Sequence, residues 1–206
     1  MAEKTPDTPP QPRRGFLGLC DRLIGPEATH AEIALILTAS LAGGAAVAVR
    51  LSQVGANGWL VVIGAALGFD LIGGVVANAT SATKRWYHRP GSTIWGHVIF
   101  LLPHVGHVAL VAWLFLNGNW RYFVAVVTLT AAAAGGVLVS PARLKCPVAV
   151  GLCLAGMGGW YYLLGPTLGL EWFVPALLLK LVGGHLVPDG SGVRAEPHAA
   201  ADSGGG

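Results

Sequence analysis

Long apolar runs, separated by short polar and basic segments, dominate the chain. A helix needs about 20 residues to cross a hydrocarbon core about 30 Å thick. Six runs predict such spans, and they cover residues 31–49, 58–80, 94–116, 122–139, 147–164 and 172–187, of which the last is the shortest. A membrane β-barrel would instead need strands with alternating polarity, and residues 124–139 show no alternation. The pattern predicts an all-α integral membrane protein, a bundle of about six transmembrane helices.

Composition and charge support this class. Only 11% of the 206 residues are charged and 53% are hydrophobic, whereas soluble domains carry about 25% charged residues. Basic side chains cluster on one side of the predicted spans, which by the positive-inside rule places both termini in the cytoplasm: Lys4, Arg13, Arg14, Arg22, Lys84, Arg85, Arg89, Arg143, Lys145 and Arg194. The net charge of +3 then follows from topology and predicts no nucleic-acid partner. We expect a multi-pass protein of the cell inner (plasma) membrane.

The segments outside the spans divide into three parts. Residues 1–14 and 189–206 have compositions typical of disordered tails, and residues 31–188 form the predicted transmembrane domain. The juxtamembrane segment 15–30 carries Phe16, Leu17, Leu19, Leu23 and Ile24 next to Arg22. It fits either a short helix lying on the membrane surface or an ordinary linker.

An acidic residue near the middle of the second span is the first candidate for function. Ionisable groups at this depth cost roughly 2.5 kcal/mol or more and usually mark a site. Asp70 is followed by Gly73, Gly74 and Ala77 on the same helix face. This strip of small residues is either a helix-packing seam or the wall of a cavity beside the acid.

Three histidines share one stripe of the third span. His97, His104 and His107, together with Phe100, recur at helical spacing, and Pro103 disturbs the backbone between them. Asp70 lies at similar depth, so Asp70, His104 and His107 predict a shared site that could hold a divalent metal. Haem is a further alternative for imidazole ligands, although the depths of the histidines match it less well.

Lys180, in the last span, decides the chemistry of this group. If its side chain reaches inward, it pairs with Asp70 and keeps the carboxylate ionised. If it faces outward, its long stem extends toward an interface and leaves a buried acid. The sequence leaves both directions open.

The favoured function is an intramembrane enzyme that acts on a lipid or isoprenoid by acid–base chemistry. Asp70 would be the general acid, and His104 and His107 would orient it or carry protons. A proton-initiated cyclisation or isomerisation, like that of terpene cyclases, needs such an acid beside aromatic faces. The predicted substrate-binding residues are Phe69, Asn78, Phe100, Trp113 and Lys180.

Three alternatives stay open. A metal held by Asp70, His104 and His107 would make the protein a membrane hydrolase. The same residues could form the relay of a proton or metal-ion transporter. Polar residues in a structural subunit could serve helix pairing alone. No nucleotide-binding, HExxH or GxSxG motif supports a more specific activity, and the favoured reaction requires no cofactor.

Overall fold

The computed structural model describes residues 11–189, and within them every regular element is a helix. The elements are α1 (Gly15–Ile24), α2 (His30–Gln53), α3 (Gly58–Ala79), α4 (Ser81–Tyr87), α5 (Ile94–Leu110), η1 (Val111–Phe115), α6 (Trp120–Val139), η2 (Ala142–Leu144), α7 (Lys145–Leu163), α8 (Phe173–Leu178) and η3 (Leu179–His185). The predicted all-α class is confirmed. Most of the predicted disordered tails, 1–14 and 189–206, lies outside the described residues.

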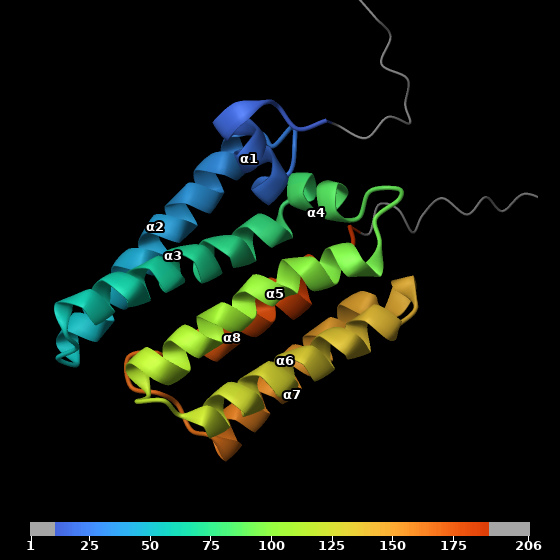
Figure 1. Cartoon of the computed structure of the whole chain (residues 1–206). Coiled ribbons are helices and arrows are strands. Elements are labelled where there is room, and N and C mark those ends of the chain that lie inside the picture. Colours follow the sequence, from blue (N-terminus) through green and yellow to red (C-terminus); the bar gives the residue numbers. More distant parts are fainter. Residues whose placement is uncertain (1–10, 190–206) are drawn as a thin grey trace, which may run out of the picture.

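Five helices are long and apolar enough to cross a membrane. They are α2, α3, α5 continued by η1, α6, and α7 preceded by η2. The sixth predicted span is a shorter apolar helix, Phe173–His185. This short helix is almost wholly buried, and Figure 1 shows it behind α5. Because other helices surround it, its length does not have to match the thickness of the lipid core.

The helices run along a common direction as two hairpins with α5 between them (Figure 1). In the α2–α3 hairpin, glycine allows the backbones to approach closely. A Cβ atom added at Gly43 would lie 2.7 Å from Ile72 Cβ, and one added at Gly68 would lie 3.0 Å from the Gly43 carbonyl oxygen. Such close packing supplies van der Waals contact, which drives helix association where lipid is as apolar as the protein.

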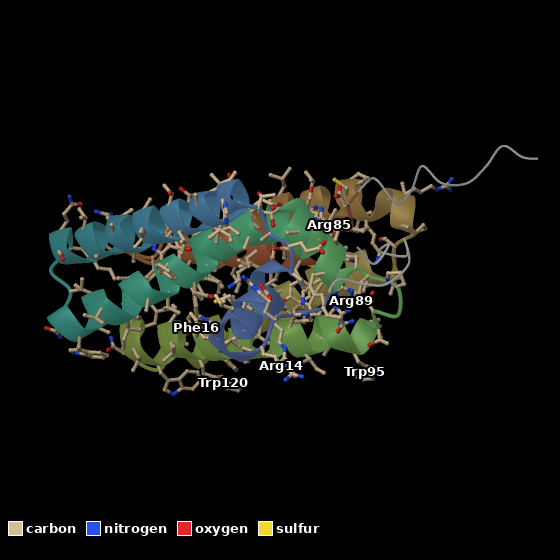
Figure 2. All side chains as sticks on the ribbon, turned by 90° about the horizontal axis from the view of Figure 1, so that it is seen from above. Arg14, Phe16, Arg85, Arg89, Trp95 and Trp120 are labelled. Atoms are coloured by element: carbon tan, nitrogen blue, oxygen red, sulfur yellow. The ribbon has the colours of Figure 1, made fainter. Side chains whose placement is uncertain are left out.

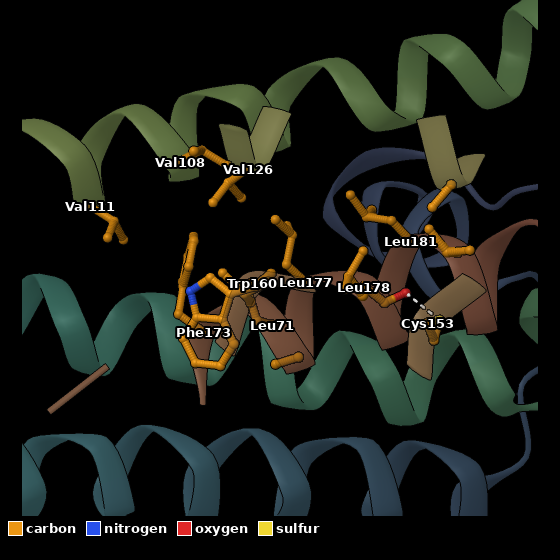
Figure 3. Packing of buried hydrophobic residues seen from close by; sticks show 14 of the residues in the cluster. Leu71, Val108, Val111, Val126, Cys153, Trp160, Phe173, Leu177, Leu178 and Leu181 are labelled. Atoms are coloured by element: carbon orange, nitrogen blue, oxygen red, sulfur yellow. Dashed lines mark hydrogen bonds between the residues drawn. The ribbon is translucent and has the colours of Figure 1, made fainter. Parts of the chain in front are cut away.

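The apolar core forms around α8 and η3. Phe173, Leu177, Leu178 and Leu181 are at most 1% exposed and pack against side chains of the surrounding helices (Figure 3). Leu71 of α3, Val108 of α5, Val126 of α6 and Trp160 of α7 belong to the same cluster. The short central helix therefore joins the two hairpins into one bundle.

Within the juxtamembrane segment 15–30, residues Gly15–Ile24 form a helix, α1. Its Phe16, Leu17, Leu19 and Leu23 side chains are exposed, as expected for a helix with one apolar face. Figure 2 shows Phe16 on the surface of the bundle. Hydrogen bonds fix its end against α4. Thr83 Oγ1 donates to the Ile24 carbonyl at 2.7 Å, and Trp86 Nε1 and Tyr87 OH donate to the Arg22 carbonyl.

Candidate functional site

Lys180 points inward and pairs with Asp70. Its Nζ atom lies 2.6 Å from Asp70 Oδ2 and 3.2 Å from the Asp70 carbonyl oxygen. The Lys180 side chain is 6% exposed, whereas that of Asp70 is 47% exposed. Asp70 lies twelve residues after the start of α3, about 18 Å along its axis, so the pair is near mid-helix. Of the two directions open to Lys180, the structure selects the ion pair.

The small-residue strip beside Asp70 is filled by neighbouring side chains. A Cβ atom at Gly74 would lie 2.3 Å from Lys180 Cε and 2.8 Å from its Nζ. A Cβ atom at Gly73 would lie 1.7 Å from Ser40 Oγ on α2. Gly74 therefore provides the space for the lysine stem, and Gly73 allows α2 to approach. The strip is a packing surface with a buried lysine in it, not the wall of an empty cavity.

Two histidines of α5 complete the group around Asp70. His107 Nε2 lies 3.4 Å from Asp70 Oδ2, and the His104 and His107 rings are 5.1 Å apart with an interplanar angle of 24°. One ligand atom each from Asp70, His104 and His107 lies within 4.8 Å of the other two. The structure thus brings together these three residues and Lys180.

Backbone carbonyls set the tautomers of both histidines. His104 Nδ1 lies 3.0 Å from the Phe100 carbonyl oxygen, and His107 Nδ1 lies 3.2 Å from that of Pro103. A carbonyl can only accept, so each Nδ1 carries the hydrogen, and the Nε2 of a neutral ring keeps its lone pair. His104 Nε2 is buried and has no hydrogen-bond partner among the described residues. The site therefore brings together hydrogen-bond acceptors, the two Nε2 atoms and the Asp70 carboxylate, that can bind a proton or a cation.

An irregular helix and a buried amide place Lys180. The chain from Leu179 to His185 is a π-helix, in which the backbone hydrogen bonds join residues five positions apart. Asn78 Nδ2 donates to the Lys180 carbonyl at 2.9 Å. Asn78 is only 3% exposed, so its amide supports the lysine backbone. Its predicted contact with substrate stays a prediction.

A second group of histidines lies nearer the α4 end of the bundle. His97 Nδ1 is 3.1 Å from His185 Nε2, and His88 Nε2 donates to the His185 carbonyl at 2.9 Å. Outside the spans, burial lowers the pKa of His88 to about 4. Phe100 stacks on His185 at 3.8 Å between ring centroids and contacts His104 at 5.4 Å. Its ring thus contacts both histidine groups.

The other two predicted aromatic residues have different surroundings. Trp113 packs edge-on against Trp120 and Phe123, with ring centroids 6.4 and 5.3 Å away. Phe69 is 42% exposed on α3. Phe100 is the predicted aromatic residue that contacts His104. The predicted contact of Phe69, Phe100 and Trp113 with substrate stays a prediction.

An apolar cavity adjoins His104. It has a volume of about 270 Å³ and lies between α5 and α6, above the buried helix. Leu101, Val108, Ala134, Gly135, Leu177 and Leu181 are among its lining residues. Its polar lining comes from His104 and Thr130, and Thr130 Oγ1 has no hydrogen-bond partner among the described residues. His104 therefore belongs both to the cavity wall and to the Asp70 group.

Comparison with protein-family models, curated proteins and solved structures finds no match for the chain. Fold and site alone define its class: a bundle of apolar helices with an Asp–Lys ion pair and two histidines at mid-helix depth.

The cavity and the π-helix had weak sequence signals. The cavity faces α6, whose run of small residues from 131 to 136 reads equally well as packing. The π-helix has Gly183 and Gly184 in it, but paired glycines are common in membrane helices. The pairing of His97 with His185 joins residues 88 positions apart, which helix periodicity cannot reveal.

Proposed function

We propose that this protein is an intramembrane enzyme that acts on a lipid or isoprenoid substrate by acid–base chemistry. The observation that carries the proposal is the position of His104. Its ring lines an apolar cavity that suits a hydrocarbon chain, and it stacks on His107, which faces the Asp70–Lys180 pair. A buried imidazole with one free nitrogen is a suitable general base or acid.

The ion pair changes the role proposed for Asp70. A carboxylate held 2.6 Å from an ammonium is a poor donor of protons to an alkene. We therefore assign proton transfer at the substrate to His104, with His107 beside it. The Asp70 carboxylate would stabilise positive charge that develops on the imidazoles, and Lys180 keeps that carboxylate ionised. This arrangement favours isomerisation or hydrolysis over a cyclisation initiated by a strong acid.

Substrate access from the bilayer is supported by exposure at the site. The Asp70 side chain is 47% exposed and that of His107 is 22% exposed, although both residues lie well inside the apolar spans Gly58–Ala79 and Ile94–Phe115. In a bundle surrounded by lipid, this opening faces the hydrocarbon phase or a second molecule. A lipid-soluble substrate could therefore enter sideways, between α3 and α5.

The proposed topology is six spans in the cell inner membrane, with both termini in the cytoplasm. Figure 2 shows Arg85, Arg89 and Trp95 gathered toward one end of the bundle. Arg50, in the last turn of α2, pairs with Glu171 at 3.0 Å. The amphipathic α1 would lie on the cytoplasmic surface of the membrane.

Photo-crosslinking tests the cavity as a binding site for hydrocarbon chains. The full-length protein in vesicles is irradiated with farnesol and with palmitic acid, each bearing a diazirine, and labelled peptides are mapped by mass spectrometry. We expect labels on α5 and α6. Gly135→Leu should abolish them, because an added Cβ there meets open space in the cavity wall, so the leucine would fill it. Gly151→Leu is the matched control on an exposed face of α7.

Catalysis is tested by turnover in the same vesicles. They are loaded with a membrane-lipid extract and isoprenoid alcohols, and products are sought by untargeted mass spectrometry. We expect a product that wild type forms and His104→Asn does not, because asparagine keeps a donor near Nδ1 but lacks Nε2. Labelling that Gly135→Leu leaves unchanged, or turnover that His104→Asn leaves unchanged, would contradict the proposal.

A proton transporter is the second candidate, favoured by the order of the imidazoles. His88, His97 and His185 lie in mutual contact, and His104 and His107 continue toward Asp70. Phe100 separates the two groups, so a proton path needs its ring to move. Proton flux into vesicles that carry a pH-sensitive dye tests this candidate. Flux that Phe100→Ala raises and Asp70→Asn removes would support transport over catalysis.

A further inference from the structure

We propose that Asp70, His104 and His107 form a binding site for a divalent transition-metal ion, and that the Lys180 ammonium is the cation which this metal displaces. The inference goes beyond the proposed function. It concerns the same side chains, but it does not depend on a lipid substrate.

The donor set has the composition and spacing of a metal site. Two imidazoles and one carboxylate, with a water as fourth ligand, are a common environment for zinc and related ions. Bond lengths of about 2.0–2.2 Å place two ligand atoms of a tetrahedral site about 3.3 Å apart. His107 Nε2 and Asp70 Oδ2 already lie 3.4 Å apart. Because all three ligand atoms lie within 4.8 Å, small side-chain movements would bring His104 into the same shell.

The hydrogen bonds around the histidines prepare them for metal binding. A ligating histidine normally donates its second ring N–H to a carbonyl or carboxylate, which fixes its tautomer. Both histidines have this arrangement, with Nδ1 bound to the carbonyls of Phe100 and Pro103. The free His104 Nε2 is an independent sign of a missing ligand, because the residue is 7% exposed and this atom is buried without a partner among the described residues.

Lys180 defines how the metal would bind. Its ammonium lies 2.6 Å from Asp70 Oδ2, the oxygen nearest His107, so a metal and the ammonium compete for one atom. After displacement, the ammonium can keep its second partner, the Asp70 carbonyl oxygen, now at 3.2 Å. Lys180 thus lowers the affinity of the site for metal without removing any ligand. A nitrogen-rich set favours Zn²⁺, Co²⁺ or Ni²⁺ over Mg²⁺ and Ca²⁺.

Cobalt titration tests the site directly. Full-length protein in detergent is stripped with a chelator and titrated with Co²⁺, and the visible d–d absorption reports coordination geometry and stoichiometry. We expect one Co²⁺ per chain with the intense bands of a tetrahedral site, displaced by Zn²⁺ and not by Mg²⁺. Lys180→Met should tighten binding on the order of tenfold or more, because it removes a competing cation next to the ion.

Histidine variants locate the ion. His104→Asn should weaken binding at least tenfold, whereas His97→Asn, which changes a buried imidazole of the other group, should leave the affinity unchanged. Thermal unfolding of each metal-free variant shows whether it is folded. If His104→Asn does not fold, the binding of Co²⁺ by Lys180→Met still decides whether the site exists. Absence of tetrahedral Co²⁺ in both wild type and Lys180→Met would overturn the proposal, as would equal binding by folded His104→Asn. If the protein binds no metal but the lipid probes still label the cavity, the metal site is rejected and the proposed function is not.

Discussion

Gly74→Ala should break the central ion pair without changing any charged group. The new Cβ atom would lie 2.3 Å from Lys180 Cε and 2.7 Å from its Cδ, so the flexible lysine stem must move away from α3. The ammonium would then leave Asp70 Oδ2, its partner at 2.6 Å. Because Lys180 is only 5% exposed, its charge would remain buried without a partner.

The expected loss of stability follows from two opposing effects. A buried charge that loses its partner costs about 3–5 kcal/mol. Alanine gains about 1 kcal/mol over glycine inside a helix. The net destabilisation should therefore be about 2–4 kcal/mol. Gly106→Ala on α5 is the matched control, because an added Cβ there meets nothing within 4 Å, and it should be neutral or stabilising.

Unfolding of the purified protein in mixed micelles measures this effect. The free energy of unfolding is compared among wild type, Gly74→Ala, Lys180→Ala and the double variant. Without the lysine stem, alanine at position 74 has room, so Gly74→Ala should cost little or nothing in the Lys180→Ala background. An equal cost in both backgrounds would show that the close packing of Gly74 concerns the helix backbone and not the ion pair, and would refute this reasoning.

Three further substitutions test the surrounding polar network. Asn78→Leu should cost about 1–3 kcal/mol in micelle unfolding because it leaves the buried Lys180 carbonyl without its donor. Thr130→Val should be neutral or stabilising in the same assay, because the Thr130 hydroxyl has no hydrogen-bond partner among the described residues. A clear loss of stability would show that this hydroxyl does form a hydrogen bond. Burial lowers the pKa of His88 in the folded protein to about 4, whereas in the unfolded chain it is about 6.5. As the pH drops from about 6.5 to 4, the unfolded chain therefore takes up a proton at His88 before the folded protein does, and the free energy of unfolding should fall. His88→Gln should reduce that fall in unfolding curves measured across this range, and an unchanged slope would show that other groups cause it.

The sequence by itself determined the helical class and the residues that merit attention. Helix length and apolar composition are local properties, so five of the predicted spans appear as long apolar helices. Helix phase is also local, and it placed His104 and His107 on one stripe of α5. The cost of ionisable groups in hydrocarbon then marked Asp70 and Lys180 without any knowledge of their partners.

Only the tertiary structure decided what these residues contact. The direction of Lys180 depends on the π-helix that carries it and on two residues of a separate helix, α3. Gly74 leaves space for the lysine stem, and the amide of Asn78 binds the Lys180 carbonyl. The sixth predicted span is a short buried helix because its neighbours, not lipid, surround it. The spacing of residues in the sequence shows which side chains share a face of one helix. The partner across the interface depends on how separate helices pack, and that packing makes Asp70 an ion-paired carboxylate beside two histidines.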